Sequence, residues 1–223
     1  MIKNELNILY NNDNILTKII GQVKDLIQLS PLYRITNHNG KMGNSLINLD
    51  EDKLIKTGIA GIYRILLKCS NAFVDLYIGE SEVCIAQRVS RCVKQAKGEN
   101  TVDEAHSAGQ LLKNDFTNYQ NEDVWKNNLF VQFIPLYILR KITNNVVIPV
   151  NPLFDDSDFK LYDFEDKSLL TFFEDKMISE FGPIGNKINK STNRATRYIN
   201  NLINYNNFKN NITIGVQYNE KRI

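Results

Sequence analysis

Two tyrosines and an arginine in this chain have side chains suited to phosphoryl chemistry. Tyr63 and Tyr77 lie in two short apolar runs, and Arg88 follows eleven residues after Tyr77. A tyrosine hydroxyl held near a cation can have its pKa lowered enough to act as a general base. An arginine can hold a phosphate oxygen through two parallel donors and stays charged at any working pH. Taken singly, each has an ordinary interpretation, because a strand tyrosine packs by its ring and a helical arginine is commonly solvated.

The two tyrosines belong to two short motifs, Gly61-Ile62-Tyr63 and Tyr77-Ile78-Gly79. Either tripeptide alone is a common strand edge. Together they stand in order on adjacent predicted strands and are followed by a predicted helix that bears Arg88. In this combination the segment resembles the paired motifs of the GIY-YIG nuclease family.

A later segment also resembles this family. The run from Glu174 to Asn186 is similar to a family pattern in which Glu-x-x-Leu-Ile is followed by Pro-x-x-Asn, with Met177 in place of leucine. The segment at His106, followed by Leu111 and Leu112, is similar to the family's middle helix, where some members carry a histidine. The resemblance covers about residues 58–190.

The resemblance implies a metal-dependent nuclease and roles for the matching positions. Tyr63 is the first candidate for the general base, and Tyr77 would orient water or phosphate. Arg88 would hold a phosphate oxygen. Glu174 would be the single carboxylate ligand of one Mg²⁺, which Mn²⁺ could replace. Asn186 would fix the local backbone or contact phosphate.

Two features depart from the family pattern. Thirteen residues separate Tyr63 from Tyr77, more than is usual, which predicts a longer hairpin loop. Cys92 stands four residues after Arg88, where some members place a histidine, and a cysteine can replace that base only with a strongly perturbed pKa. His106 is predicted to supply the missing imidazole, and a capping or surface histidine is the equal alternative.

Hydrophobic periodicity predicts the elements that position these residues. Helical spacing occurs within the first 30 residues and over about 82–96, 105–119 and 168–181. Strand-like runs cover 62–67, 73–78 and 130–139, where Pro135 forces an edge position or a break. Residues 33–58 lack clear periodicity and indicate irregular structure. We expect an α+β fold, with a small three-stranded antiparallel sheet flanked by helices.

We expect three segments: an N-terminal helical extension over 1–57, the nuclease-like domain over 58–190 that the resemblance implies, with an acidic insertion at 143–165, and a basic tail over 191–223. Residues 149–180 carry nine acidic and three basic residues, whereas 181–223 carry seven basic and one acidic. These counts fit a functional arrangement, with carboxylates near a metal ion and basic side chains on a phosphate backbone. They fit equally well an acidic loop and a basic helix that are simply exposed to solvent. The predicted nucleic-acid contacts are Arg91, Lys94, Lys187, Lys190, Arg194 and Arg197.

The overall composition limits the classes of protein. The 223 residues include 27 Lys and Arg against 25 Asp and Glu, so a strongly basic coat is excluded. The apolar runs are shorter than the roughly 20 residues of a membrane helix, and the amino terminus lacks a secretory pattern. Three cysteines without a Cys-x-x-Cys pair argue against disulfides and structural zinc. A cytoplasmic protein without membrane contact is expected.

The predicted function is a Mg²⁺-dependent endonuclease that acts on DNA, of restriction type or phage type because the extensions are short. The N-terminal helix and the basic tail would add DNA contacts or a homodimer interface. The alternative from another class is a DNA-binding or assembly protein that keeps this fold without cleaving. The joint presence of Tyr63, Tyr77, Arg88 and Glu174 speaks mildly against that alternative.

Overall fold

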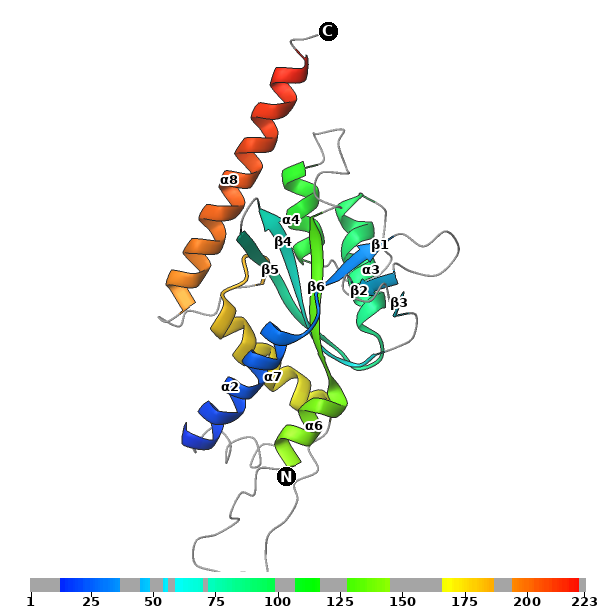
Figure 1. Cartoon of the computed structure of the whole chain (residues 1–223), viewed down its shortest axis with the longest axis vertical. Helices are drawn as coiled ribbons and strands as arrows, with labels where there is room; N and C mark the ends of the chain where they lie inside the picture. The colour runs from blue at the N-terminus through cyan, green and yellow to red at the C-terminus, as the bar shows by residue number, and fades with distance from the viewer. Residues whose placement is uncertain are drawn as a thin grey trace, which may run out of the picture.

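The computed structural model describes residues 13–36, 45–48, 54–55, 59–69, 72–98, 107–116, 128–144, 166–186 and 194–220. Its strands are β1 (Tyr33–Thr36), β2 (Ser45–Asn48), β3 (Leu54–Ile55), β4 (Gly61–Cys69), β5 (Ala72–Ser81) and β6 (Leu129–Pro135). Its helices are α2 (Asp13–Leu29), α3 (Ile85–Ala96), α4 (Ser107–Phe116), α6 (Leu136–Asn144), α7 (Asp166–Phe181) and α8 (Arg194–Glu220), as Figure 1 shows.

The strands form one antiparallel sheet in the order β3-β2-β1-β6-β4-β5. The predicted α+β class is confirmed, and the three predicted strands are the contiguous β6, β4 and β5. The prediction of irregular structure over 33–58 is wrong, because β1, β2 and β3 lie there and extend the sheet. These strands have at most four residues, too few for an alternating pattern to stand out from the polar residues around them.

The β4–β5 hairpin carries both tyrosine motifs. Its strands pair from Gly61↔Ser81 to Cys69↔Ala72, so only two residues connect them and the predicted longer loop is wrong. The extra length lies within the strands. Ile65 pairs with Tyr77 whereas Leu66 pairs with Asp75, so Leu76 is an additional residue in β5 and forms a bulge.

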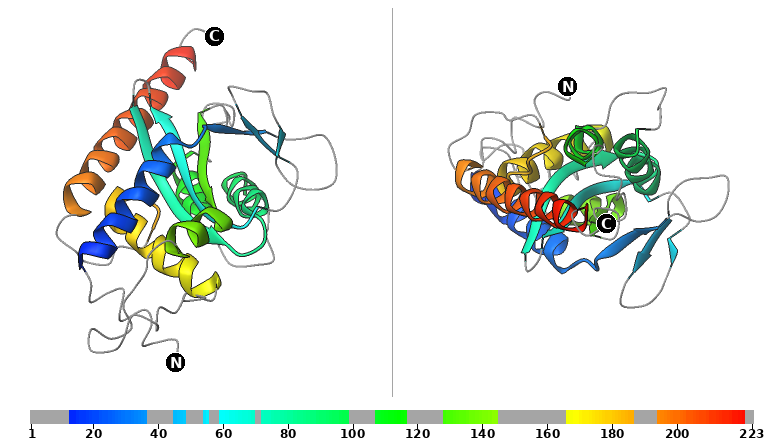
Figure 2. Two further views of the ribbon diagram at one scale, coloured as in Figure 1. Left: turned by 60° about the horizontal axis from the view of Figure 1, so that its bottom comes forward. Right: turned by 90° about the horizontal axis from the view of Figure 1, so that it is seen from above.

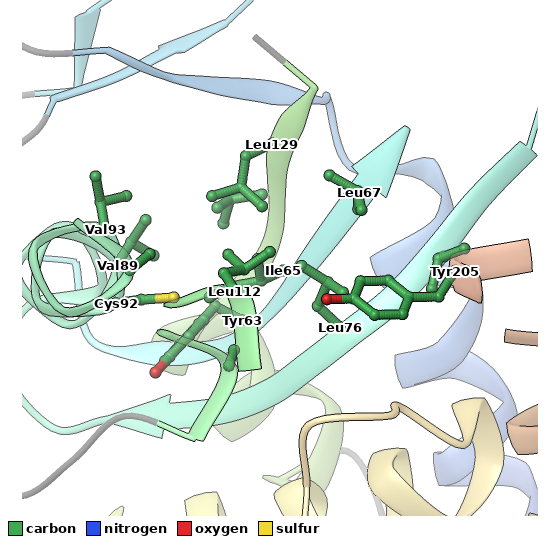
Figure 3. Packing of buried hydrophobic residues seen from close by; sticks show 14 of the residues in the cluster. Tyr63, Ile65, Leu67, Leu76, Val89, Cys92, Val93, Leu112, Leu129 and Tyr205 are labelled. Carbon is green, nitrogen blue, oxygen red and sulfur yellow. The ribbon is translucent and has the colours of Figure 1, made fainter. Parts of the chain in front are cut away.

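Each face of the sheet has its own hydrophobic cluster, because successive strand residues point to opposite sides. Tyr63 and Ile65 face α3 and α4 in one cluster, which Tyr205 of α8 joins, as Figure 3 shows. Ile62 and Ile78 face α2, α6 and α7 in the other cluster. Figure 2 shows helices on both sides of the sheet. The two motifs therefore contribute to both cores.

Several element boundaries differ from the prediction. The α3 helix begins at Ile85, three residues after the predicted start, and Val83 is 72% exposed before the helix. Just before the helix, the Ser81 hydroxyl oxygen accepts a hydrogen bond from the Cys84 amide at 2.9 Å. The third strand ends at Pro135, and α6 follows at once, because proline cannot donate to a strand ladder. The start of the predicted acidic insertion falls in α6, and residues 145–165 lie outside the described residues.

The predicted basic tail contains α8, which packs against β4, β5 and α7 and runs on past the sheet (Figure 1). Tyr205 is 1% exposed and its hydroxyl donates to Asp115 of α4 at 2.9 Å. The buried Asn201 accepts a hydrogen bond from the Asp75 amide and donates to the carbonyls of Phe181 and Gly182. This part of α8 is therefore a structural element of the domain.

The described residues contain no helix that could span a membrane. None of their helices combines the length and the apolar character that crossing a bilayer requires.

Candidate active site

Four of the predicted site residues come together from four elements: Tyr63 on β4, Tyr77 on β5, Arg88 on α3 and Glu174 on α7. The two tyrosines lie on one face of the hairpin, with ring centroids 6.1 Å apart. The charge of Arg88 lowers the pKa of both hydroxyls and of Glu174, while Glu174 raises the pKa of both hydroxyls. Because the interaction between charges weakens with distance, these effects place the four groups near one another.

The glycines of both motifs are required by close backbone approach. A Cβ atom at Gly79 would lie 2.6 Å from the Tyr63 hydroxyl oxygen and 2.5 Å from a Tyr77 ring carbon. Gly61 has φ of +155°, and a Cβ atom there would lie 2.1 Å from the Ile134 carbonyl oxygen on β6. Any larger residue would move a site tyrosine or separate two paired strands.

The expected lowering of the Tyr63 pKa is wrong for this structure. Tyr63 is 1% exposed, and burial raises the pKa of its hydroxyl well above the ordinary value, with the nearby Tyr77 and Cys92 adding to the shift. Arg88 acts in the expected direction, but burial outweighs it. Burial likewise raises the pKa of the half-buried Tyr77 to about 12. Both tyrosines therefore hold their protons at neutral pH.

Glu174 is half-buried on α7, the helix that packs against β5. Burial raises the pKa of its carboxyl to about 7, and the negative charges of Glu80 and Asp175 act in the same direction. Lys167 and Arg88 oppose this shift. A cation beside Glu174 would favour its ionised form, since cations displace protons from their ligands.

The Asn186 side chain is hydrogen-bonded to the backbone of the edge strand β5. Its side-chain oxygen accepts from the Ile78 amide at 2.9 Å and its side-chain nitrogen donates to the Ile78 carbonyl at 2.8 Å. The amides of Ile184 and Gly185 also donate to β5 carbonyls. Of its two predicted roles, fixing the local backbone is the one that these contacts provide, beside Tyr77 and Gly79.

The two residues considered for an additional base have different outcomes. Cys92 is fully buried, and burial raises the pKa of its thiol to about 12, so it stays protonated at neutral pH. His106 lies outside the described residues. Cys69, Cys84 and Cys92 are free thiols. Among the described residues, no group of three or more His, Cys, Asp or Glu is arranged to hold a metal ion.

The predicted nucleic-acid contacts are scattered over several elements. Arg91 is half-buried and Lys94 is exposed on α3, the helix that bears Arg88. Arg197 of α8 instead pairs with Glu180 of α7 at 2.6 Å, and Lys24 of α2 binds the same carboxylate at 2.7 Å. This triad joins three helices and accounts for Arg197 structurally. The side chain of Arg194, and all of Lys187 and Lys190, lie outside the described residues.

Sequence reasoning missed Glu80 and Lys167. Glu80 directly follows the second motif, and its Oε1 accepts a hydrogen bond from Lys167 of α7. The position of Glu80 was the only signal available, because Lys167 lies 87 residues away in the chain. The buried pair of Arg64 and Asp75 was also missed, in which the Arg64 guanidinium lies 4.1 Å from the Phe181 ring centroid.

The described residues thus form an α+β protein in which two tyrosines, an arginine and a glutamate cluster around the edge strand β5. No protein-family model, no curated protein and no solved structure matches the chain. The resemblance in the two tripeptides and in Glu174 to Asn186 stays a prediction.

Proposed function

We propose that this chain is a metal-dependent endonuclease of the GIY-YIG type that hydrolyses DNA phosphodiester bonds. The observation that carries the proposal is the convergence of Tyr63, Tyr77, Arg88 and Glu174. These residues are up to 111 positions apart in the sequence, yet the charges of Arg88 and Glu174 act on the pKa of both tyrosine hydroxyls, and the charge of Arg88 acts on the pKa of Glu174. Hydrolysis of a phosphodiester needs a positioned water, a cation for the growing negative charge and stabilisation of the leaving oxygen.

Glu174 fits the single protein ligand of Mg²⁺ or Mn²⁺. It offers carboxylate oxygens, the ligand type that hard cations prefer, and other negative charges lie beside it. A bound Mg²⁺ would neutralise charge on the phosphate and help to ionise water. In the proposal, Glu174 holds that ion beside Arg88 and the two hydroxyl groups.

Arg88 is the group suited to the phosphate itself. It is half-buried, which limits competition from solvent, and its guanidinium can donate two parallel hydrogen bonds to phosphate oxygens. The sequence of α3 contains Arg88, Arg91 and Lys94 and no acidic residue. We assign this helix to the DNA backbone, where such a run of positive charge is favourable.

The two tyrosines have separate tasks in the proposal. Because Tyr63 holds its proton, it can move a proton only as a relay, accepting one from the attacking water while passing its own to the Glu174 carboxylate, whose charge acts on the Tyr63 hydroxyl. Tyr77 is more exposed than Tyr63 and is assigned to orienting the water or the phosphate.

A second candidate is a DNA-binding or assembly protein that does not cleave. The observation in its favour is that Tyr63 is 1% exposed and both tyrosines have raised pKa values, as in a packed structural core. Such a protein would bind DNA with the same Arg88 helix. It would not need the carboxylate of Glu174.

Incubation with supercoiled plasmid, with and without Mg²⁺, separates the two candidates. We expect nicking only with Mg²⁺, and loss of nicking in Glu174→Ala with DNA binding retained. Asp175→Ala is the matched control, because Asp175 is exposed and points about 100° away around the helix. DNA binding without cleavage by the unmodified chain would favour the non-catalytic candidate. Full cleavage by Glu174→Ala would show that Glu174 is not the metal ligand.

A further inference from the structure

Glu80 has a largely buried carboxylate, and one of its two oxygens has no partner among the described residues. It lies on β5 immediately after Gly79 and pairs with Ile62 of β4. Its side chain is 11% exposed, and Oε1 accepts a hydrogen bond from Lys167. Oε2 is fully buried and has no hydrogen-bond partner among the described residues. A buried carboxylate oxygen without a partner is costly, and an unseen ion or water is a common reason for one.

The face of α7 that meets Glu80 is the face that bears Glu174. Lys167 and Glu174 are seven residues apart, which is nearly two helical turns, so both point in the same direction from α7. Lys167 binds Glu80 directly, and the charge of Glu80 acts on both Glu174 and Tyr77. Two carboxylates, Glu80 of β5 and Glu174 of α7, thus face the contact between these two elements, and the Lys167 ammonium is bound to Glu80.

The Lys167 ammonium pairs with only one of the two carboxylate oxygens of Glu80. Its side chain is 54% exposed, and it also contacts the exposed Glu82 at 3.0 Å, so it can move away at small cost. It does not reach Glu80 Oε2. A small cation with oxygen ligands would satisfy that atom and remove the repulsion between Glu80 and Glu174.

We infer that Glu80 and Glu174 together hold one divalent cation, with the Lys167 ammonium balancing Glu80 while the cation is absent. The choice of Mg²⁺ or Mn²⁺ as this cation rests on the proposed function. The second carboxylate goes beyond the single-ligand site of that proposal. It predicts that the free protein binds the ion before DNA arrives, because both proposed ligands belong to the protein itself.

Binding of Mn²⁺ to the free protein, followed by electron paramagnetic resonance, tests the inference without DNA and without a measurement of activity. We expect Glu80→Gln to weaken Mn²⁺ binding by about tenfold or more, since it removes one ligand charge. Glu82→Gln is the matched control and should change the affinity less than about twofold, because Glu82 contacts the same lysine but is 51% exposed. Lys167→Gln should strengthen binding a few fold by removing a competing cation.

Melting temperatures establish that each variant is folded. Mn²⁺ binding to Glu80→Gln with unchanged affinity overturns the inference, and so does an unmodified chain that binds no Mn²⁺ at millimolar concentration. If Glu80→Gln does not fold, Lys167→Gln decides, and an affinity that falls in this variant counts against the inference. The two proposals fail separately. Mn²⁺ binding that depends on Glu80, without plasmid cleavage, would contradict only the proposed nuclease function. Plasmid cleavage with unchanged Mn²⁺ affinity in Glu80→Gln would contradict only the role of Glu80 as a second metal ligand.

Discussion

The Tyr63 hydroxyl lies against Gly79, its partner residue across the β4–β5 hairpin, so that a Cβ atom at residue 79 would be 2.6 Å from the Tyr63 hydroxyl oxygen. The tyrosine of the first motif thus depends on the glycine of the second. The same glycine is also in contact range of Tyr77, since the Cβ atom would be 2.5 Å from that ring. The two motifs form one packed unit.

Gly79→Ala should therefore displace a site tyrosine and destabilise the fold. We expect a loss of about 1–3 kcal/mol in the free energy of unfolding, the usual cost of overpacking, together with loss of plasmid cleavage. Denaturant unfolding measures the first effect. Gly21→Ala in α2 is the control, because a Cβ atom at Gly21 would meet nothing within 4 Å among the described residues beyond its chain neighbours and its own helix backbone, and it should stabilise the helix by about 0.5–1 kcal/mol. Equal stability of the two variants would contradict the packing argument.

Tyr63→Phe and Tyr77→Phe separate the roles of the two hydroxyls. Each change keeps the ring, so folding should lose at most about 1 kcal/mol from an altered hydrogen bond. We expect Tyr63→Phe to slow cleavage about 10²–10⁴-fold, the scale for losing a proton-transfer group, and Tyr77→Phe to slow it less. Cleavage rates at matched pH and Mg²⁺ give the comparison. The reverse order would assign the relay to Tyr77, and no effect of either would leave both as core residues.

Arg88→Ala should lower turnover by at least ~10²-fold, the scale for losing one strong electrostatic donor in the transition state, with a much smaller loss of DNA affinity. Arg88→Lys should fail as well, because an ammonium group cannot make two parallel hydrogen bonds. Lys94→Ala on the exposed side of α3 is the control. It should leave turnover intact and reduce the slope of log affinity against log salt by about 0.9, one phosphate contact. Equal losses of binding and turnover in Arg88→Ala would make Arg88 a positioning contact.

Glu174 makes the stability of the fold depend on pH. Its pKa rises from the ordinary 4.5 to about 7 on folding, so the folded state binds the proton more tightly than the unfolded chain. This contribution is complete below pH 4.5 and is lost as the pH rises through 7. Glu174→Gln should match the unmodified chain at pH 4 and melt higher at pH 8. After allowance for partial exposure we expect a gain on the order of 1 kcal/mol, or about 2–4 °C.

Thermal melts of both proteins at the two pH values, without divalent cations, check this prediction. A lower melting temperature for Glu174→Gln at pH 8 would show that the ionised carboxylate is favourably paired. For the same reason, cleavage at limiting Mg²⁺ should increase from about pH 6 to about pH 8, and more Mg²⁺ should shift the midpoint to lower pH because metal and proton compete.

Asn186→Ala should loosen the edge strand β5 next to the site. The change removes both side-chain hydrogen bonds to Ile78, for which we expect a cost of about 1–3 kcal/mol. Hydrogen exchange of the Ile78 amide should become faster. Asn200→Ala is the matched control in this asparagine-rich chain, because Asn200 is exposed on α8, and its effect should stay within about 0.5 kcal/mol. An unchanged exchange rate of the Ile78 amide would show that the two hydrogen bonds from Asn186 are not needed to hold β5.

The central elements of this fold were predictable from the amino-acid pattern. Long periodic or alternating runs predicted α2, α7 and the three strands β4, β5 and β6, because burial of one face leaves a regular spacing of apolar residues. The motifs also identified Tyr63, Tyr77, Arg88 and Glu174, which the structure brings together. The degree of burial was the part that spacing could not predict, and it reverses the expected pKa shift of Tyr63.

The meeting of distant residues became visible only once the chain was folded. The contacts of Glu80 with Lys167, of Asn186 with Ile78, and of Arg197 with Glu180 link elements that are far apart along the chain or lie on different helices. Local patterns report which face of an element is buried, but they contain no information about the element that will cover it. The short strands β1–β3 depend on the same information, since their place in the sheet comes from the pairing of β1 with β6, of β2 with β1 and of β3 with β2 rather than from their own periodicity.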